Sequence, residues 1–126
     1  MDDPYIQEFN FPTFKRGDTF PSRIIRTEQP LGTPMAITSA LMQIRTKDGT
    51  LVYEWKTTGN SANATITGDG DNEITLGEIP YSTAEGFPPG DHRYDLEVIF
   101  TSGLRKLTIL QGLFPVSADV SKPTSA

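Results

Sequence analysis

The amino-acid sequence predicts an all-β protein, a single antiparallel β-sandwich of immunoglobulin-like or jelly-roll-like type with seven to eight short strands. Three observations favour this class. Ten prolines and eleven glycines recur at short intervals and leave few stretches long enough for a three-turn helix. The runs between them are rich in isoleucine, valine, threonine, phenylalanine and tyrosine, which are enriched in strands. The best runs alternate apolar and polar residues, as a strand with one buried face does.

The first strands are predicted to lie at sheet edges. Residues 9–14 alternate aromatic and polar side chains but include Pro12, which cannot donate a hydrogen bond to a sheet, so they form an edge strand or an arm. Residues 16–18 make a turn. Residues 19–27 are the next predicted strand, and Pro21 near its start again indicates an edge.

The middle of the chain predicts two pairs of strands. Residues 39–46 alternate well, and residues 51–56 return after the Asp-Gly dipeptide at positions 48–49, which is typical of a tight hairpin turn. Residues 64–67 and 73–76 are two further short strands on either side of a glycine-rich turn.

The C-terminal third predicts one helical turn and the clearest strand of the chain. The helical turn spans residues 81–85, ahead of a Pro-Pro-Gly run. The strand that follows has an apolar face that we assign to the core, made of His92, Tyr94, Leu96, Val98 and Phe100. The Tyr94 hydroxyl is expected to find a backbone partner while its ring is buried. Residues 104–116 run back, and Gly112 within them is expected to mark a β-bulge.

Length and organisation indicate one domain. A chain of 126 residues can bury enough surface for a single core without disulfides. Residues 1–13 are assigned to an N-terminal arm or edge strand, residues 14–117 to the β-sandwich domain, and residues 118–126 to a flexible C-terminal tail.

Composition narrows the function classes. The absence of cysteine removes disulfides, thiolate metal sites and cysteine nucleophiles, and it fits a cytoplasmic folding environment. The net charge of −5 and the scattered lysines and arginines argue against nucleic acid as a partner. No run of 18 apolar residues occurs, so no membrane partner is expected, and the acidic start at residues 1–4 is unlike a secretory signal.

Three short patterns have ordinary structural interpretations. The Arg-Gly-Asp sequence at residues 16–18 is common turn chemistry. Asp69, Asp71 and Glu73 could offer oxygens to Ca²⁺, but the run is too short for a full calcium loop, and a solvated hairpin turn is favoured. Asn63 begins a glycosylation sequon in a chain without a secretory signal. We therefore predict no metal site and no cofactor.

The single histidine does not indicate catalysis. Asp91 precedes His92, yet neighbouring residues of a strand point to opposite faces, so this carboxylate is poorly placed to orient the imidazole ring. No carboxylate pair stands out, and no glycine-rich loop leads into a helix that could hold a phosphate. We predict no catalytic residues and no enzymatic activity.

Aromatic side chains offer the possible contact sites. Phe9, Phe11 and Phe14 lie in the predicted arm, where three exposed rings would require a partner to cover them. The same rings could instead complete the core of the domain. Trp55 and Tyr53 are the candidates for a sugar-binding surface, but the alternation of their strand predicts that both rings pack inward.

Two segments carry a resemblance to a known group of proteins. They are Phe-Lys-Arg-Gly-Asp-Thr-Phe at residues 14–20 and Pro-Gly-Asp-His-Arg-Tyr-Asp-Leu-Glu at residues 89–97, followed by Gly103, residues 112–116 and residues 119–121. The pattern resembles small phage and prophage virion-associated β-sandwich proteins, similar to the N-terminal domain of phage baseplate upper proteins. Pro115 departs from that pattern, which usually has a hydrogen-bond donor there.

This resemblance implies a bacteriophage virion structural or adaptor protein of the tail baseplate or neck, acting by protein–protein contacts. The alternatives are a capsid-surface decoration protein and a carbohydrate- or receptor-binding module. The implied partners are other virion proteins and further copies of the chain within the particle. The implied location is the virion, assembled in the cytoplasm of the bacterial host.

Overall fold

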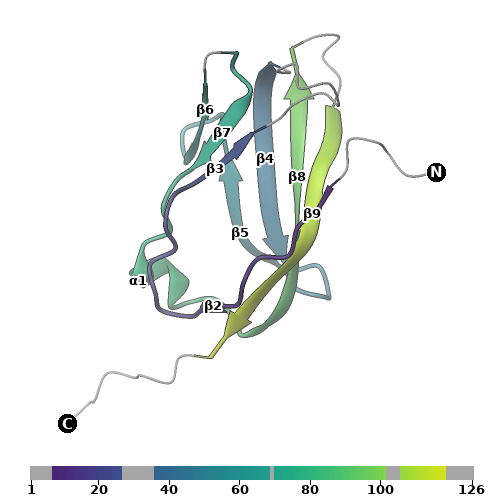
Figure 1. The fold of residues 1–126 in the computed structure, drawn as a ribbon. Coiled ribbons are helices and arrows are strands. Elements are labelled where there is room, and N and C mark those ends of the chain that lie inside the picture. Colours follow the sequence, from purple (N-terminus) through teal and green to yellow (C-terminus); the bar gives the residue numbers. More distant parts are fainter. Residues whose placement is uncertain (1–6, 27–35, 69, 102–105, 119–126) are drawn as a thin grey trace.

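The computed structural model describes residues 7–26, 36–68, 70–101 and 106–118. It confirms the predicted all-β sandwich: a six-stranded sheet and a three-stranded sheet enclose one core (Figure 1). The described residues contain more strands than expected because two two-residue strands form near the N-terminus. These two strands run parallel to their neighbour, whereas the other pairings are antiparallel.

The six-stranded sheet is built around the C-terminal strand pair. Its order is β1-β9-β8-β4-β5, and β2 also pairs with β9 further along that strand. The strands are β1 (Gln7–Glu8), β2 (Phe14–Lys15), β4 (Ile37–Arg45), β5 (Leu51–Lys56), β8 (Gly90–Phe100) and β9 (Lys106–Ser117). Strands β1 and β2 thus both lie along the edge of β9 that does not pair with β8.

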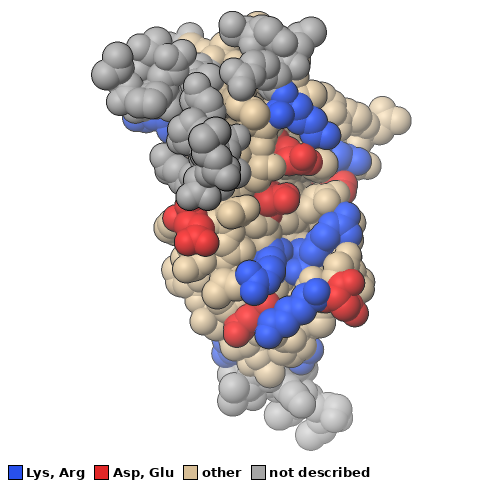
Figure 2. All heavy atoms as spheres, turned by 90° about the vertical axis from the view of Figure 1, so that its right-hand side faces the viewer, with Lys and Arg blue, Asp and Glu red and all other residues tan. Residues whose placement is uncertain are grey.

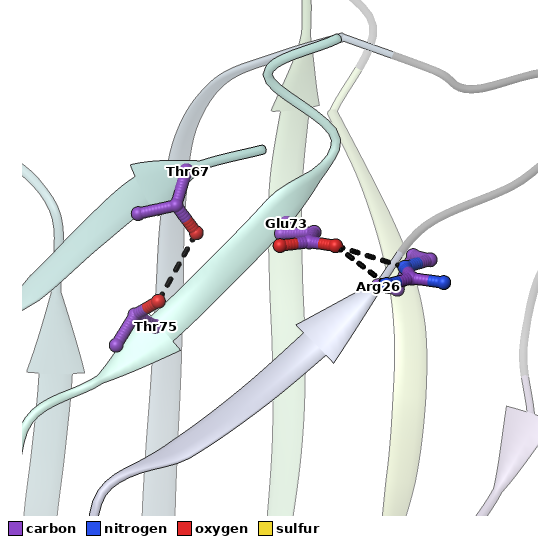
Figure 3. A network of polar contacts seen from close by, with 4 residues as sticks. All are labelled: Arg26, Thr67, Glu73 and Thr75. Atoms are coloured by element: carbon purple, nitrogen blue, oxygen red, sulfur yellow. Dashed lines mark hydrogen bonds and ion pairs between the residues drawn. The ribbon is translucent and has the colours of Figure 1, made fainter. Parts of the chain in front are cut away.

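The three-stranded sheet packs across the core from the larger one. Its order is β3-β7-β6, with β3 (Arg23–Arg26), β7 (Glu73–Leu76) and β6 (Ala64–Thr67). The predicted strands at residues 64–67 and 73–76 are confirmed, and β3 is an edge strand as Pro21 indicated. Figure 3 shows the polar pairs on its outer surface, where Arg26 contacts Glu73 and Thr67 contacts Thr75.

The connections follow the predicted turn chemistry. The hairpin between β4 and β5 turns at Asp48-Gly49, and Gly49 has a φ of 92°, which favours glycine. The Asp48 carboxylate accepts hydrogen bonds from Thr46 and Thr50 across this turn, and these bonds hold its pKa below the usual value. The predicted helical turn is also confirmed, as α1 (Tyr81–Ala84).

The core is formed by alternate side chains of the strands of both sheets. Trp55 on β5 is 1% exposed, and its indole N–H donates to the Gly77 carbonyl at 2.9 Å, so a large ring is buried without an unpaired polar group. Tyr53 packs beside it with ring centroids 4.9 Å apart. Both rings therefore face inward, as predicted. The apolar face predicted for β8 is also confirmed, since all five of its side chains are buried.

The predicted bulge lies at a different position. The pairing of β8 with β9 shifts where Leu96 and Glu97 face Leu110 and Thr108, so Ile109 is the extra residue and Gly112 lies within the regular ladder. Gly112 has another role, because a Cβ there would lie 2.0 Å from the Phe9 carbonyl oxygen. Glycine is required at this position by the close approach of the N-terminal segment.

The domain boundaries set at residues 1–13, 14–117 and 118–126 stay predictions. Within the first range, residues 7–8 form the edge strand β1. Residues 1–6 and 119–126 lie outside the described part of the chain. In the ranges that are described, no helix is long and apolar enough to span a membrane.

Candidate binding face

The residues singled out for catalysis or glycosylation lie in structural positions. His92 is 4% exposed, and its Nε2 contacts the Pro88 carbonyl oxygen, while Asp91 points outward on the other face of β8. The Asn63 amide donates to the Glu54 carbonyl at 2.9 Å and to the Tyr53 hydroxyl at 3.1 Å. This side chain caps the edge of β5 and is not presented to solvent as a glycan acceptor. The expectation that the protein is not an enzyme stays a prediction.

The candidate metal ligands are only partly described. Asp69 lies outside the described residues, and Glu73 is bound to Arg26 rather than directed at Asp71. Among residues 7–26, 36–68, 70–101 and 106–118, no group of three or more His, Cys, Asp and Glu side chains is arranged to hold a metal ion. The absence of a metal and of a cofactor stays a prediction.

The three arm phenylalanines lie in two environments. Phe11 and Phe14 are 7% and 9% exposed and belong to the core, whereas Phe9 is 48% exposed. Phe11 packs against Tyr94 and Phe114, with ring centroids 4.9 and 5.1 Å apart. The alternative in which these rings complete the core therefore describes Phe11 and Phe14, and a partner contact stays a prediction for Phe9.

The outer face of the six-stranded sheet carries many polar and charged side chains. We define it as the side chains of β4, β5, β8, β9 and β1 that point away from the core. Strand pairing arranges them in rows across the sheet. One row contains Arg45 and Arg93 between two leucines, Leu51 and Leu113, and the next consists of Glu54, Gln43, Asp95, Gln111 and Glu8. Figure 2 views the molecule from the β9 side and shows basic and acidic side chains interspersed.

The first row places two positive charges side by side. Arg45 and Arg93 are direct partners in the pairing of β4 with β8. Like charges at such positions repel, and the nearby Asp95 carboxylate, whose pKa Arg45 lowers, offsets only part of that cost. Arg45 is held by hydrogen bonds to the Gln43 side chain at 2.9 Å and to the Gly49 carbonyl at 2.8 Å. The Arg93 side chain forms no hydrogen bond or ion pair with any described residue.

The second row carries a carboxylate with a perturbed pKa. Burial raises the pKa of Asp95, the neighbouring Glu97 carboxylate raises it further, and the Arg45 guanidinium lowers it. Partial burial beside its strand neighbours is the largest of these causes, but the side chain as a whole is exposed, so the effect on stability is small.

These two rows line a polar hollow. Its volume is about 330 Å³, its floor is formed by Tyr94 and Gly112, and its polar walls are Glu8, Gln43, Arg45, Arg93, Asp95 and Gln111. A smaller hollow of about 220 Å³ lies further along the same face and includes Lys56, Glu97 and Lys106. Lys106 and Glu97 approach each other to 3.9 Å there. The outer face therefore carries basic and acidic side chains next to each other.

The sequence did not reveal this site. Its residues are spread over five strands, with one or two polar residues on each, and in the sequence each resembles an ordinary solvent-facing residue. The available signal was the outward position of Arg93 and Asp95 on β8, but their cross-strand neighbours depend on strand order and register.

Comparisons with known proteins identify a fold neighbour but no family. No family model matches the chain, and no curated protein matches it. Among solved structures, the chain is similar to CopC from Methylosinus trichosporium OB3b, with a TM-score of 0.51 and 15% identity over 88% of this chain and 89% of that one. At this identity the likeness shows the β-sandwich fold alone.

The fold neighbour corrects the phage interpretation. The resemblance to baseplate upper proteins was wrong, because the chain matches a structure of CopC over 88% of its length and no family model matches it. The implied role in a tail baseplate or neck, its capsid and carbohydrate- or receptor-binding alternatives, and the virion location are corrected with it. The motifs at residues 14–20 and 89–97 are turns and strand starts, which recur in β-sandwiches of different function. What the comparisons establish is a CopC-like β-sandwich fold.

Proposed function

We propose that this domain is a non-catalytic protein-binding module whose outer face binds an extended segment of a partner protein through an acidic side chain. The observation that carries the proposal is the pairing of Arg45 with Arg93 at directly opposed positions of β4 and β8. A bound carboxylate would relieve the repulsion between the two guanidinium groups. The repulsion between the two arginines destabilises the free protein, and its relief in the complex would add to the free energy of binding.

The charges around the arginine pair favour a carboxylate over a phosphate group. Arginine presents a planar set of N–H donors that matches both anions. The polar hollow also contains the carboxylates of Glu8 and Asp95, so its two positive charges are balanced by two negative ones. A second negative charge on the ligand would be repelled by these groups, and a singly charged carboxylate is therefore the better ligand.

The spacing of the rows favours an extended polypeptide. Alternate residues of a strand are about 7 Å apart, so Arg93 and Asp95 repeat at the same interval as alternate side chains of an extended peptide. A glutamate placed on the arginine pair would bring the residue two positions along to the row of Asp95 and Glu8, where lysine fits. The preferred segment is therefore Glu-Xaa-Lys.

The surroundings of the only histidine support a non-catalytic role. His92 is enclosed on the inner face of β8, on the opposite side of the sheet from the polar hollow. Its Nε2 is engaged by the Pro88 carbonyl oxygen. A general base must reach the proton that it removes, and this ring has no path to a ligand on the outer face.

A peptide titration tests the proposal. The ¹⁵N-labelled domain is titrated at low ionic strength with the capped peptide acetyl-Thr-Glu-Thr-Lys-Thr-amide, and backbone amide shifts are mapped. We expect the largest shifts at residues 43–45 and 93–95. The matched peptide with glutamine in place of glutamate should bind at least about tenfold more weakly, since a charge-assisted hydrogen bond contributes about 1.5–3 kcal/mol and about 1.4 kcal/mol is tenfold in affinity.

Two variants separate the site from general charge effects. Arg93→Gln should weaken binding of the glutamate peptide by about tenfold. Arg23→Gln makes the same charge change on β3 of the other sheet and should leave binding unchanged. Equal affinity for the glutamate and glutamine peptides, or equal weakening by both variants, would refute the proposal.

A further inference from the structure

The N-terminal segment, residues 7–16, lies along β9 as an added parallel strand. Its backbone N–H groups donate to carbonyl oxygens of β9, from Phe9 to Gln111 at 3.0 Å, from Phe11 to Leu113 at 2.9 Å and from Arg16 to Ser117 at 3.0 Å. The other edge of β9 pairs with β8. The segment therefore covers a sheet edge that would otherwise expose unpaired backbone groups.

The edge of β9 is shaped to receive this backbone. Gly112 leaves room for the Phe9 carbonyl, which would lie 2.0 Å from a Cβ at that position. The buried Tyr94 hydroxyl donates to the same carbonyl at 2.6 Å. The side-chain oxygen of Asn10 accepts from the Leu113 N–H at 3.0 Å. We call this edge of β9 the β9 groove; its contacts fix the register of the segment at Phe9 and Asn10, and the register shifts by one residue before Phe14 pairs with Val116.

The buried Phe11 ring determines which segment can bind along β9. The Phe11 ring is buried against Tyr94, Phe114 and Phe20, with centroid distances of 4.9, 5.1 and 6.1 Å. Burying a phenylalanine side chain contributes about 1.5–3 kcal/mol. An empty groove would expose this pocket together with the open edge, so a competing occupant must supply the same ring and the same backbone pattern.

A short turn joins the segment to the rest of the domain. The Asp18 N–H donates to the Lys15 carbonyl at 3.1 Å, and Gly17 has a φ of 92°. Residues 17–19 then lead to Phe20, which bridges to Ile79 in the body of the sandwich. The contacts of the segment in the groove do not depend on which chain supplies it. Short connecting turns of this kind permit an exchange of strands between copies.

We infer that a second copy of this chain can occupy the β9 groove with its own residues 7–16, so that the protein self-associates by strand exchange. In the exchanged dimer each groove holds the same Phe11 ring and the same backbone hydrogen bonds as in the monomer. The free energies of the monomer and the exchanged dimer then differ only in the conformation of the turn at Gly17 and in the translational and rotational entropy that is lost when two chains associate. Because a short link provides an effective concentration on the order of millimolar, the dimer forms as protein concentration approaches that value.

Disulfide trapping tests this inference, because the natural chain contains no cysteine. Glu8 and Gln111 are direct neighbours in the pairing of β1 with β9. Full-length Glu8→Cys and Gln111→Cys chains are mixed, unfolded and refolded together at about 1 mM, where exchange competes with closure on the same chain. Redox buffer is present, and mixed disulfide dimers are counted by mass spectrometry. We expect their yield to rise with protein concentration.

Two controls make the outcome decisive. Glu8→Cys mixed with Glu54→Cys places the second cysteine on β5, at the opposite edge of the sheet, and should give several-fold fewer mixed dimers. The double variant Glu8→Cys/Gln111→Cys, refolded at micromolar concentration where closure within one chain is favoured, should remain monomeric. Trp55 fluorescence confirms folding of each variant. Equal yields for the two mixtures would overturn the inference. The assay contains no peptide ligand, so its failure would leave the proposed function of the outer face standing.

Discussion

The outer surfaces of the two sheets differ in how charged side chains are paired across neighbouring strands. On the three-stranded sheet, Arg26 lies directly opposite Glu73 and forms an ion pair with it at 2.8 Å (Figure 3). On the six-stranded sheet, Arg45 lies directly opposite Arg93, and the two positive charges face each other. The first arrangement stabilises its sheet, and the second opposes the pairing of its strands.

The difference separates a structural surface from a candidate binding surface. The three-stranded sheet has only four-residue strands, so cross-strand pairs are a useful part of its stability. Strands β8 and β9, with 11 and 12 residues, have a long hydrogen-bonded ladder and a large buried face. The larger sheet can therefore tolerate unfavourable charges on its outer face without losing its fold.

The largest effect is expected at the covered edge of the larger sheet. Gly112→Ala should lower the free energy of unfolding by about 1–3 kcal/mol, because the new Cβ would collide with the Phe9 carbonyl. Urea unfolding measures the loss. Gly86→Ala is the matched control, since its Cβ would make only an ordinary contact of 3.6 Å with the Thr83 carbonyl oxygen. Equal losses in both variants would show that the N-terminal segment is not closely held.

The pH dependence of stability tests the bond beneath the polar hollow. Burial raises the pKa of the Tyr94 phenol above its ordinary value of 10.0. The unfolded chain therefore loses this proton first, and the stability that is complete below about pH 10 falls as the pH rises further. Tyr94→Phe should flatten this decline, at a cost of about 1 kcal/mol at neutral pH. Tyr81→Phe, at an exposed position, should leave the decline unchanged when unfolding is measured from pH 8 to 12.

A pair of charge removals tests the comparison of the two surfaces directly. Glu73→Gln should destabilise the protein by about 0.5–1 kcal/mol, since it removes a cross-strand ion pair. Arg93→Gln should leave stability unchanged or raise it by a few tenths of a kcal/mol, since it removes a repulsion. Thermal unfolding of both variants distinguishes the surfaces, and a loss of equal size in each would remove the distinction.

The smallest expected effect concerns the second polar row. Because its pKa is raised, the Asp95 carboxylate opposes folding when ionised, and stability increases as the pH falls toward the ordinary aspartate pKa. Asp95→Asn should stabilise the protein at neutral pH by a few tenths of a kcal/mol, a small value because the side chain is exposed. The gain should vanish near pH 4. A destabilised variant at neutral pH would show instead that Asp95 stabilises the arginine row.

Local features of the fold were accessible from the sequence. The Asp-Gly turn between β4 and β5, the short strands β6 and β7, and the buried face of β8 were all predicted, since each depends on residues close together in the chain. The Tyr94 hydroxyl was expected to bind a backbone group, and that group proved to be Phe9, 85 positions away. The bulge was predicted at Gly112 but lies at Ile109. Gly112 is needed instead for the close approach of Phe9, a residue too far away in the sequence for this contact to be predicted.

The sequence by itself determined that this is a β-sandwich and which side chains of β8, together with Tyr53 and Trp55, face the core, because alternation is a property of the single strand. Tertiary structure alone decided that Arg45 faces Arg93 and that Gly112 receives the Phe9 carbonyl. Both relations depend on strand order and register between distant segments. A shift of one residue would turn every side chain to the other face, so register is set by the burial of the whole core rather than by any local motif.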